Sequence, residues 1–173
     1  QFPKAYAAFQ GQDPRGFSYS IIEAKRPGVI LTSLEDSANA DSLAILRPRL
    51  SKSDRFRAVV AAFSYLGTPY VYNFDFRTDN ELVCSELIYK AYEGAVGLTL
   101  TPEELNGRPM LSPNRIGKKF DDELGTAQQE LDLVLFLDGN EVQETAVDRD
   151  EEAFRSSWRR PKWHILKDYA PTF

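Results

Sequence analysis

The sequence contains one cysteine and one histidine that could serve nucleophilic chemistry. Cys84 falls in the opening turns of a helix expected over residues Leu82 to Tyr92. The apolar stripe that predicts this helix has helical spacing and consists of Cys84, Leu87, Ile88, Ala91 and Tyr92. The amides and the dipole at a helix start favour a thiolate. Cys84 is therefore a candidate nucleophile, and the competing interpretation is a small buried side chain.

Short strands and further helices are expected around this helix. Two apolar runs joined through Pro27-Gly28, at residues 19–24 and 29–34, predict a hairpin. Ser51 or Ser53 is expected to cap a second helix that ends near Gly67, and Ser112-Pro113 begins a third. Further strands are expected at 43–46, 132–137 and 163–166, and alternating aromatics predict an extended segment at 70–76. These elements together predict an α+β fold.

Composition excludes several classes of protein. The chain has 173 residues and a formal net charge of −5, which suits one domain (residues 1–173) and not a nonspecific nucleic-acid binder. No apolar run reaches about 18 residues, so no integral membrane segment is expected. One cysteine rules out an internal disulfide, and the Cys/His count is too small for a structural zinc site. We expect no metal and no cofactor.

Several charged runs and one turn can also be predicted. The carboxylate runs Asp121-Asp122-Glu123 and Glu151-Glu152 are expected to be solvated, as is the basic run 159–162. Asp138-Gly139-Asn140 is expected to form a turn after the 132–137 strand.

Three local patterns together resemble one family of enzymes. They are Gly67-Thr68-Pro69-Tyr70, the aromatic run 72–76, and Cys84-Ser85-Glu86-Leu87. In this spacing they resemble the nucleophile region of papain-like cysteine hydrolases of the NlpC superfamily. The closest likeness is to the circularly permuted YiiX-like branch, which is related to lecithin:retinol acyltransferase-like proteins. The likeness runs from Ile21 to Tyr92, and its general pattern continues to about Trp163.

The resemblance implies a fold and a role for each of several residues. The fold is a permuted papain-like domain whose nucleophile helix packs on a small antiparallel sheet, with Cys84 as the nucleophile. Residues 21–24 resemble the strand that carries an orienting residue, here Glu23, whose carboxylate would accept an imidazole N–H. Tyr70 would line the oxyanion or substrate site. The competing interpretations are a solvated Glu23 and a Tyr70 that belongs to the core.

The pattern of the family is broken at the histidine. The permuted branch carries its catalytic histidine upstream of the cysteine, and no histidine precedes Cys84. Three explanations stay open. A histidine-bearing N-terminal strand belongs to a segment outside this chain, which the start at Gln1 favours; or His164 serves as an alternative base; or the domain is a degenerate binding module.

The sequence thus predicts a cysteine hydrolase that cleaves an amide or ester bond through a thioester on Cys84. The substrate would be a small molecule, a peptide, a cell-wall fragment or a lipid acyl group, and an N-terminal fragment carrying the histidine is a possible partner. The alternative function is a ligand- or partner-binding module. The resemblance implies a bacterial cell-envelope or secreted location.

Overall fold

The computed structural model describes residues 7, 9–70, 82–95, 97–105, 107–140 and 143–160. Its elements run in the order β1 (Tyr19–Lys25), β2 (Gly28–Ser33), α2 (Leu34–Ser37), β3 (Ser42–Pro48), α3 (Lys52–Ser64), α4 (Cys84–Tyr92), β4 (Glu103–Leu105), β5 (Arg108–Met110), α5 (Pro113–Glu123), β6 (Leu131–Asn140), β7 (Thr145–Asp148) and α6 (Glu151–Ser157). Short antiparallel sheets and separate helices confirm the predicted α+β class.

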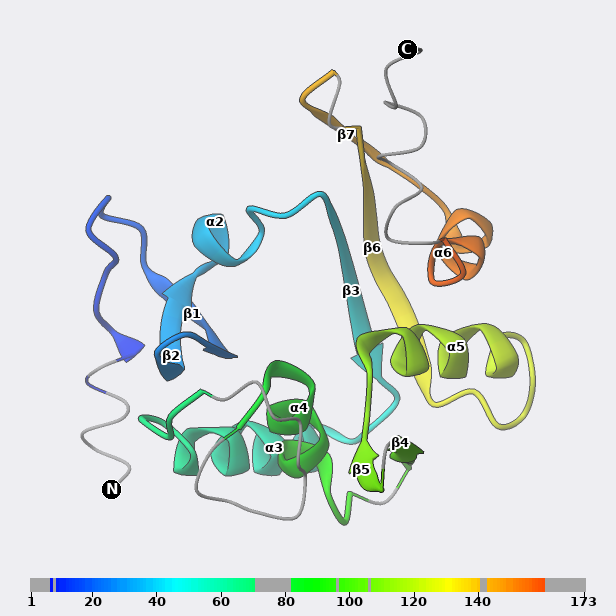
Figure 1. Ribbon diagram of the computed structural model, residues 1–173, viewed down its shortest axis with the longest axis horizontal. Helices are drawn as coiled ribbons and strands as arrows, with labels where there is room; N and C mark the ends of the chain where they lie inside the picture. The colour runs from blue at the N-terminus through cyan, green and yellow to red at the C-terminus, as the bar shows by residue number, and fades with distance from the viewer. Residues whose placement is uncertain are drawn as a thin grey trace.

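The described strands form three antiparallel sheets (Figure 1). The predicted hairpin is confirmed as β1 and β2, and it packs against α4. Strands β3, β6 and β7 form the second sheet, with α5 and α6 beside β6, and β4 pairs with β5 in the third. Helix α3 packs against α4. Helix α4, which begins at Cys84, therefore contacts both the hairpin and α3.

Buried side chains gather into two main clusters. One joins α5, α6 and β6 through the aromatic rings of Phe120, Phe136 and Phe154, which pack against each other in tilted pairs. The other joins the β1–β2 hairpin to α4 through Ala24, Val29, Leu82 and Leu87. Burial of such side chains provides the main stabilisation of each part of the fold.

The turn at residues 67–70 is fastened to β2. The amide of Val29 donates to the carbonyl of Thr68 at 2.8 Å, and the amide of Gly67 donates to the carbonyl of Val29 at 2.9 Å. Gly28 permits this approach, because a Cβ there would lie 2.5 Å from the Thr68 carbonyl oxygen. The segment leading towards the cysteine helix is thus held by the hairpin.

The predicted helix starts are confirmed in α3 and α5. Ser51 is the N-cap of α3 and accepts a hydrogen bond from the amide of Asp54 at 3.1 Å. Ser112 precedes α5, with Pro113 as the first helical residue.

The expected segment 70–76 beyond Tyr70, and the expected strand 163–166, lie outside the described residues. Among the helices that are described, none is long and apolar enough to cross a bilayer.

Two local predictions are wrong. Asp138-Gly139-Asn140 is not a turn, since β6 continues through it and pairs with β7. Gly139 is required there by a close approach, because a Cβ would overlap the backbone of Asp41. The run 121–123 is also not uniformly solvated, since Asp121 is buried. Glu151 and Glu152 are exposed, as expected.

Asp121 is the centre of a polar cluster that joins α5 to α6. Its carboxylate accepts hydrogen bonds from Arg155 at 2.7 Å, from Arg159 at 2.5 Å and from the Trp158 indole at 3.2 Å. The hydrogen bond from Arg155 is the largest influence holding the pKa of Asp121 below its ordinary value. Arg159 and Arg160 are exposed, as expected, and each also forms an ion pair, Arg159 with Asp121 and Arg160 with Asp138.

Replacing Asp121 and its neighbour Asp122 one at a time compares the contribution of a buried carboxylate with that of an exposed one. Asp121→Ala should lower the free energy of unfolding by about 2 kcal/mol, because it removes charge-assisted hydrogen bonds at a buried site. Asp122→Ala should change it by less than about 0.5 kcal/mol, because Asp122 makes only a surface ion pair with Lys118. Urea unfolding followed by fluorescence measures both, and equal effects would contradict this role for Asp121.

Candidate active site

The start of α4 is set by Val83. This residue is extended (φ −105°, ψ 167°) and has no exposed surface, and the helix begins at the next residue, Cys84. The start therefore lies two residues later than predicted, at Cys84 in place of Leu82. Burial of Val83 fixes which residue becomes the first of the helix.

Cys84 is exposed. On α4 the side chains of Leu87 and Ala91 are buried, whereas Ile88, one turn after Cys84, is 40% exposed. Within the predicted apolar stripe, Cys84 and Ile88 are therefore exposed, whereas Leu87 and Ala91 are buried. The thiol lies at the surface, where the first-turn amides have no acceptor four residues earlier in the helix. A negative sulfur or an oxyanion would be stabilised at this position.

Glu86 reinforces the helix start and was missed as a site residue. It is 1% exposed, and its Oε2 accepts a hydrogen bond from the Val83 amide at 3.3 Å. Lys90, one turn later, places its Nζ 3.7 Å from Oε1 in a buried ion pair. The signal available in the sequence was a glutamate at the third helical position, the reciprocal half of a capping box.

Tyr70 lies beside the residues that precede the cysteine. It is half-buried and packs against both the Val83–Leu111 cluster and the cluster that contains Leu82 and Leu87. Its amide donates to the Pro27 carbonyl at 3.0 Å, and it forms an isolated parallel bridge with Leu82. These contacts place Tyr70 next to the residues that precede the N-terminal end of α4. Its role towards a substrate stays a prediction.

Glu23 lies on β1, and its carboxylate is directed to β2 and α2. Its Oε1 accepts a hydrogen bond from Ser37 at 2.8 Å and lies 3.0 Å from the Lys25 ammonium. Partial burial would raise the pKa of Glu23, but hydrogen bonds from Thr32, Lys25 and Ser37 outweigh it and lower the pKa below its ordinary value. Glu23 is therefore ionised at neutral pH.

The two faces of β1 differ in what they contact. Ile22 and Ala24, on either side of Glu23, belong to the cluster that packs on Leu87 of α4. Since neighbouring side chains of a strand point to opposite faces, Glu23 faces away from that cluster. Within the described ranges, the contacts of Glu23 join it to the hairpin and α2 and not to Cys84. The orienting role of Glu23 stays a prediction.

His164 lies outside the described residues, so its prediction as an alternative base stays untested. Among the residues that are described, no group of three or more His, Cys, Asp and Glu side chains is placed to hold a metal ion. The chemistry that the described part offers is thus an exposed thiol at a helix start, beside a tyrosine and a buried glutamate.

Comparison with known proteins decides the family. The family model for a permuted papain-like amidase enzyme, YaeF/YiiX, C92 family, matches residues 7–135. The chain belongs to this family. The match confirms the predicted permuted papain-like fold and a hydrolase of the amidase class, whereas the relation to lecithin:retinol acyltransferase-like proteins stays a prediction.

One solved structure of the family is similar to this chain. The crystal structure of metalloprotein YiiX from Escherichia coli O157:H7 matches with 21% sequence identity and a TM-score of 0.45. The match covers 80% of this chain and 78% of that chain. No curated protein matches.

Asp13 anchors the segment that leads from β2 into α2. Its carboxylate accepts hydrogen bonds from the Ser33 hydroxyl at 2.8 Å and from the amides of Arg15 and Phe17 at 2.9 and 3.0 Å. Ser33 is in turn the N-cap of α2, and Ser37, the last residue of α2, donates a hydrogen bond to Glu23. Although burial would raise the pKa of Asp13, these hydrogen bonds lower it from 3.8 to about 2.

The lowered pKa of Asp13 predicts a pH-dependent effect on stability. Asp13→Asn should lower the melting temperature at neutral pH, because the ionised carboxylate is favoured only in the folded state. Because the pKa of Asp13 is lower in the folded state, the carboxylate stabilises the fold above pH 3.8, and this stabilisation is lost as the pH falls towards about 2. The difference between wild type and variant should therefore narrow over that window in thermal unfolding. A difference that stays constant down to pH 2 would contradict the assignment.

Proposed function

We propose that this protein is a cysteine amidase whose nucleophile is Cys84. The observation that supports this most strongly is the exposed thiol at the first residue of α4, in a chain of a papain-like amidase family. A thiolate is favoured at a helix start, and the same amides can stabilise a developing oxyanion. Cys84 is also the chain's only cysteine, so no other thiol can serve.

The reaction proceeds in two steps. The Cys84 thiol gives its proton to the imidazole and its sulfur attacks the carbonyl carbon of the amide; the C–N bond then breaks, and the amine leaves with that proton from the imidazolium. Water next gives a proton to the imidazole and attacks the thioester, the C–S bond breaks to release the carboxylic acid, and the imidazolium returns the proton to the sulfur. The backbone amide at Cys84 is one donor to the oxyanion, and Tyr70 lines the substrate site.

The imidazole of this reaction comes from outside the described residues. His164 is the one histidine of the chain, and the alternative is a histidine on a separate N-terminal segment. In this proposal the ionised Glu23 accepts the second imidazole N–H and fixes its tautomer. That role requires Glu23 to exchange a present contact, such as the Lys25 ammonium, for the imidazole.

Replacement of the thiol tests the nucleophile. Cys84→Ser should abolish hydrolysis of aminoacyl 7-amido-4-methylcoumarin substrates, because a serine hydroxyl is a much weaker nucleophile at this site. Ile88→Ser is the matched control, since it places a serine one turn later on the same exposed side of α4 and should retain activity. Unfolding curves verify that both variants fold. Activity retained in Cys84→Ser would remove the assignment.

Replacement of Glu23 tests the orienting role separately. Glu23→Gln should lower kcat by at least about a hundredfold with little change in KM, because the imidazolium loses its counter-charge. Glu23→Asp should recover part of this loss. Glu35→Gln is the matched control: it makes the same substitution at an exposed glutamate in the first turn of α2, and it should leave the rate unchanged. If Glu23→Gln changes stability alone, Glu23 is only an anchor of the hairpin.

The second candidate function is a non-catalytic module that binds a ligand or partner. It is favoured by the lack of any histidine before Cys84. Complete inactivity towards amide and ester substrates, in the presence of any N-terminal segment that carries a histidine, would support this function. Peptide, cell-wall and lipid acyl groups are all consistent with an exposed thiol, and amides are the class that the family description names.

A further inference from the structure

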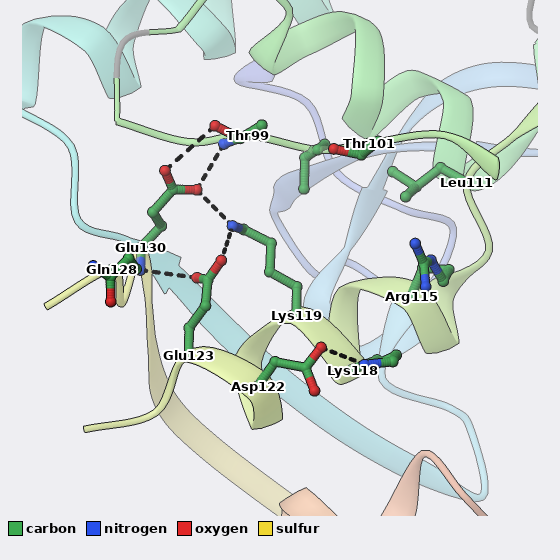
Figure 2. A pocket seen from close by; sticks show the side chains of 11 residues that line it. Thr99, Thr101, Leu111, Arg115, Lys118, Lys119, Asp122, Glu123, Gln128 and Glu130 are labelled. Carbon is green, nitrogen blue, oxygen red and sulfur yellow. Dashed lines mark hydrogen bonds and ion pairs between the residues drawn. The ribbon is translucent and has the colours of Figure 1, made fainter. Parts of the chain in front are cut away.

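A pocket whose lining does not include Cys84 lies beside α5. It has a volume of about 480 Å³, within the range of roughly 300–1,000 Å³ that is typical of small-molecule sites. Its walls are the segment 99–101, Leu111, the outer side of α5 and the residues that lead into β6 (Figure 2). The proposal below concerns ligand binding in this pocket and goes beyond catalysis at Cys84.

One side of the pocket carries excess negative charge. The Lys119 ammonium lies between the carboxylates of Glu123 and Glu130, 2.6 Å from the latter, and all three side chains are mostly buried. Glu130 also accepts a hydrogen bond from the Thr99 amide at 2.7 Å. Two carboxylates around one ammonium leave a net charge of −1. Because each carboxylate has about four acceptor sites, capacity for a further cation remains.

The other side of the pocket carries a guanidinium. Figure 2 shows Arg115 beside Leu111, across the pocket from Glu130. Arg115 binds Glu103 at 2.8 Å, and both side chains are partly exposed, at 33% and 43%. Such a surface pair contributes little free energy, and the guanidinium has five N–H donors. An incoming carboxylate can therefore take the place of Glu103.

Besides these charged residues the lining includes two leucines, Leu100 and Leu111, next to Thr99 and Thr101. Leu111 is 3% exposed, and Leu100 packs against it. Both belong to the cluster that contains Val83, the residue before Cys84. The pocket thus combines an acceptor for a cation, a donor for an anion and an apolar surface, each contributed by different residues.

We propose that this pocket binds a short zwitterionic peptide. Its carboxylate would bind Arg115, its ammonium group would bind Glu123 and Glu130, and its apolar side chain would lie on Leu100 and Leu111. The charge arrangement selects for both free ends at once, because blocking either end leaves one charged side of the pocket without its counter-ion.

Calorimetric titration with the dipeptide alanyl-leucine tests the proposal in the full chain. Saturable binding is expected, and both alanyl-leucinamide and N-acetyl-alanyl-leucine should bind at least about tenfold more weakly. Cys84→Ser should bind alanyl-leucine as wild type does, so this result is independent of the proposed amidase. Absence of saturable binding, or equal binding of the dipeptide and its amide, would overturn the proposal.

Variants of the guanidinium pair test the orientation of the peptide. Arg115→Gln should remove the preference for alanyl-leucine over its amide, while Glu103→Gln should strengthen dipeptide binding because it removes the competing carboxylate. Arg57→Gln is the matched control, since Arg57 is an exposed arginine paired with Asp54 on α3. A preference for the free carboxylate that persists in Arg115→Gln would overturn the proposed role of Arg115.

Discussion

The burial of Val83 is the constraint on which the candidate site depends. Because Val83 has no exposed surface and an extended backbone, the helix cannot begin before Cys84. Glu86 holds the Val83 amide from within the first turn, and Leu87 and Ala91 anchor the inner face of α4. The consequence is a thiol at the surface, at the end of the helix where negative charge is stabilised. A shift of the helix start by one residue would turn that thiol to another side of α4.

The elements that carry the site follow local rules and were predictable from sequence. The β1–β2 hairpin follows from two apolar runs around Pro27-Gly28, and α3 and α5 follow from Ser51 and from Ser112-Pro113. The cysteine helix was predictable to within two residues. The family was predictable because three motifs share one spacing, although each motif alone is common.

Tertiary contacts explain what the sequence did not reveal. Asp138-Gly139-Asn140 has turn chemistry, but pairing with β7 extends the strand through it. Asp121 looks like a solvated carboxylate in the sequence, but Arg155 of α6 and Arg159, which follows α6, bind it in the fold. The exposure of Cys84 and Ile88 on α4 depends on tertiary contacts in the same way. Helical spacing identifies a stripe of residues, whereas the surrounding hairpin and α3 decide which edge of that stripe is covered.

The rate at which iodoacetamide labels the single cysteine tests the central claim most directly. Because the chain has one thiol, intact mass spectrometry reports Cys84 alone. At about pH 6.5, where an ordinary thiol is almost fully protonated, the account predicts labelling at least about tenfold faster than that of N-acetylcysteine. Labelling at or below the rate of N-acetylcysteine would contradict an activated thiol at the start of α4.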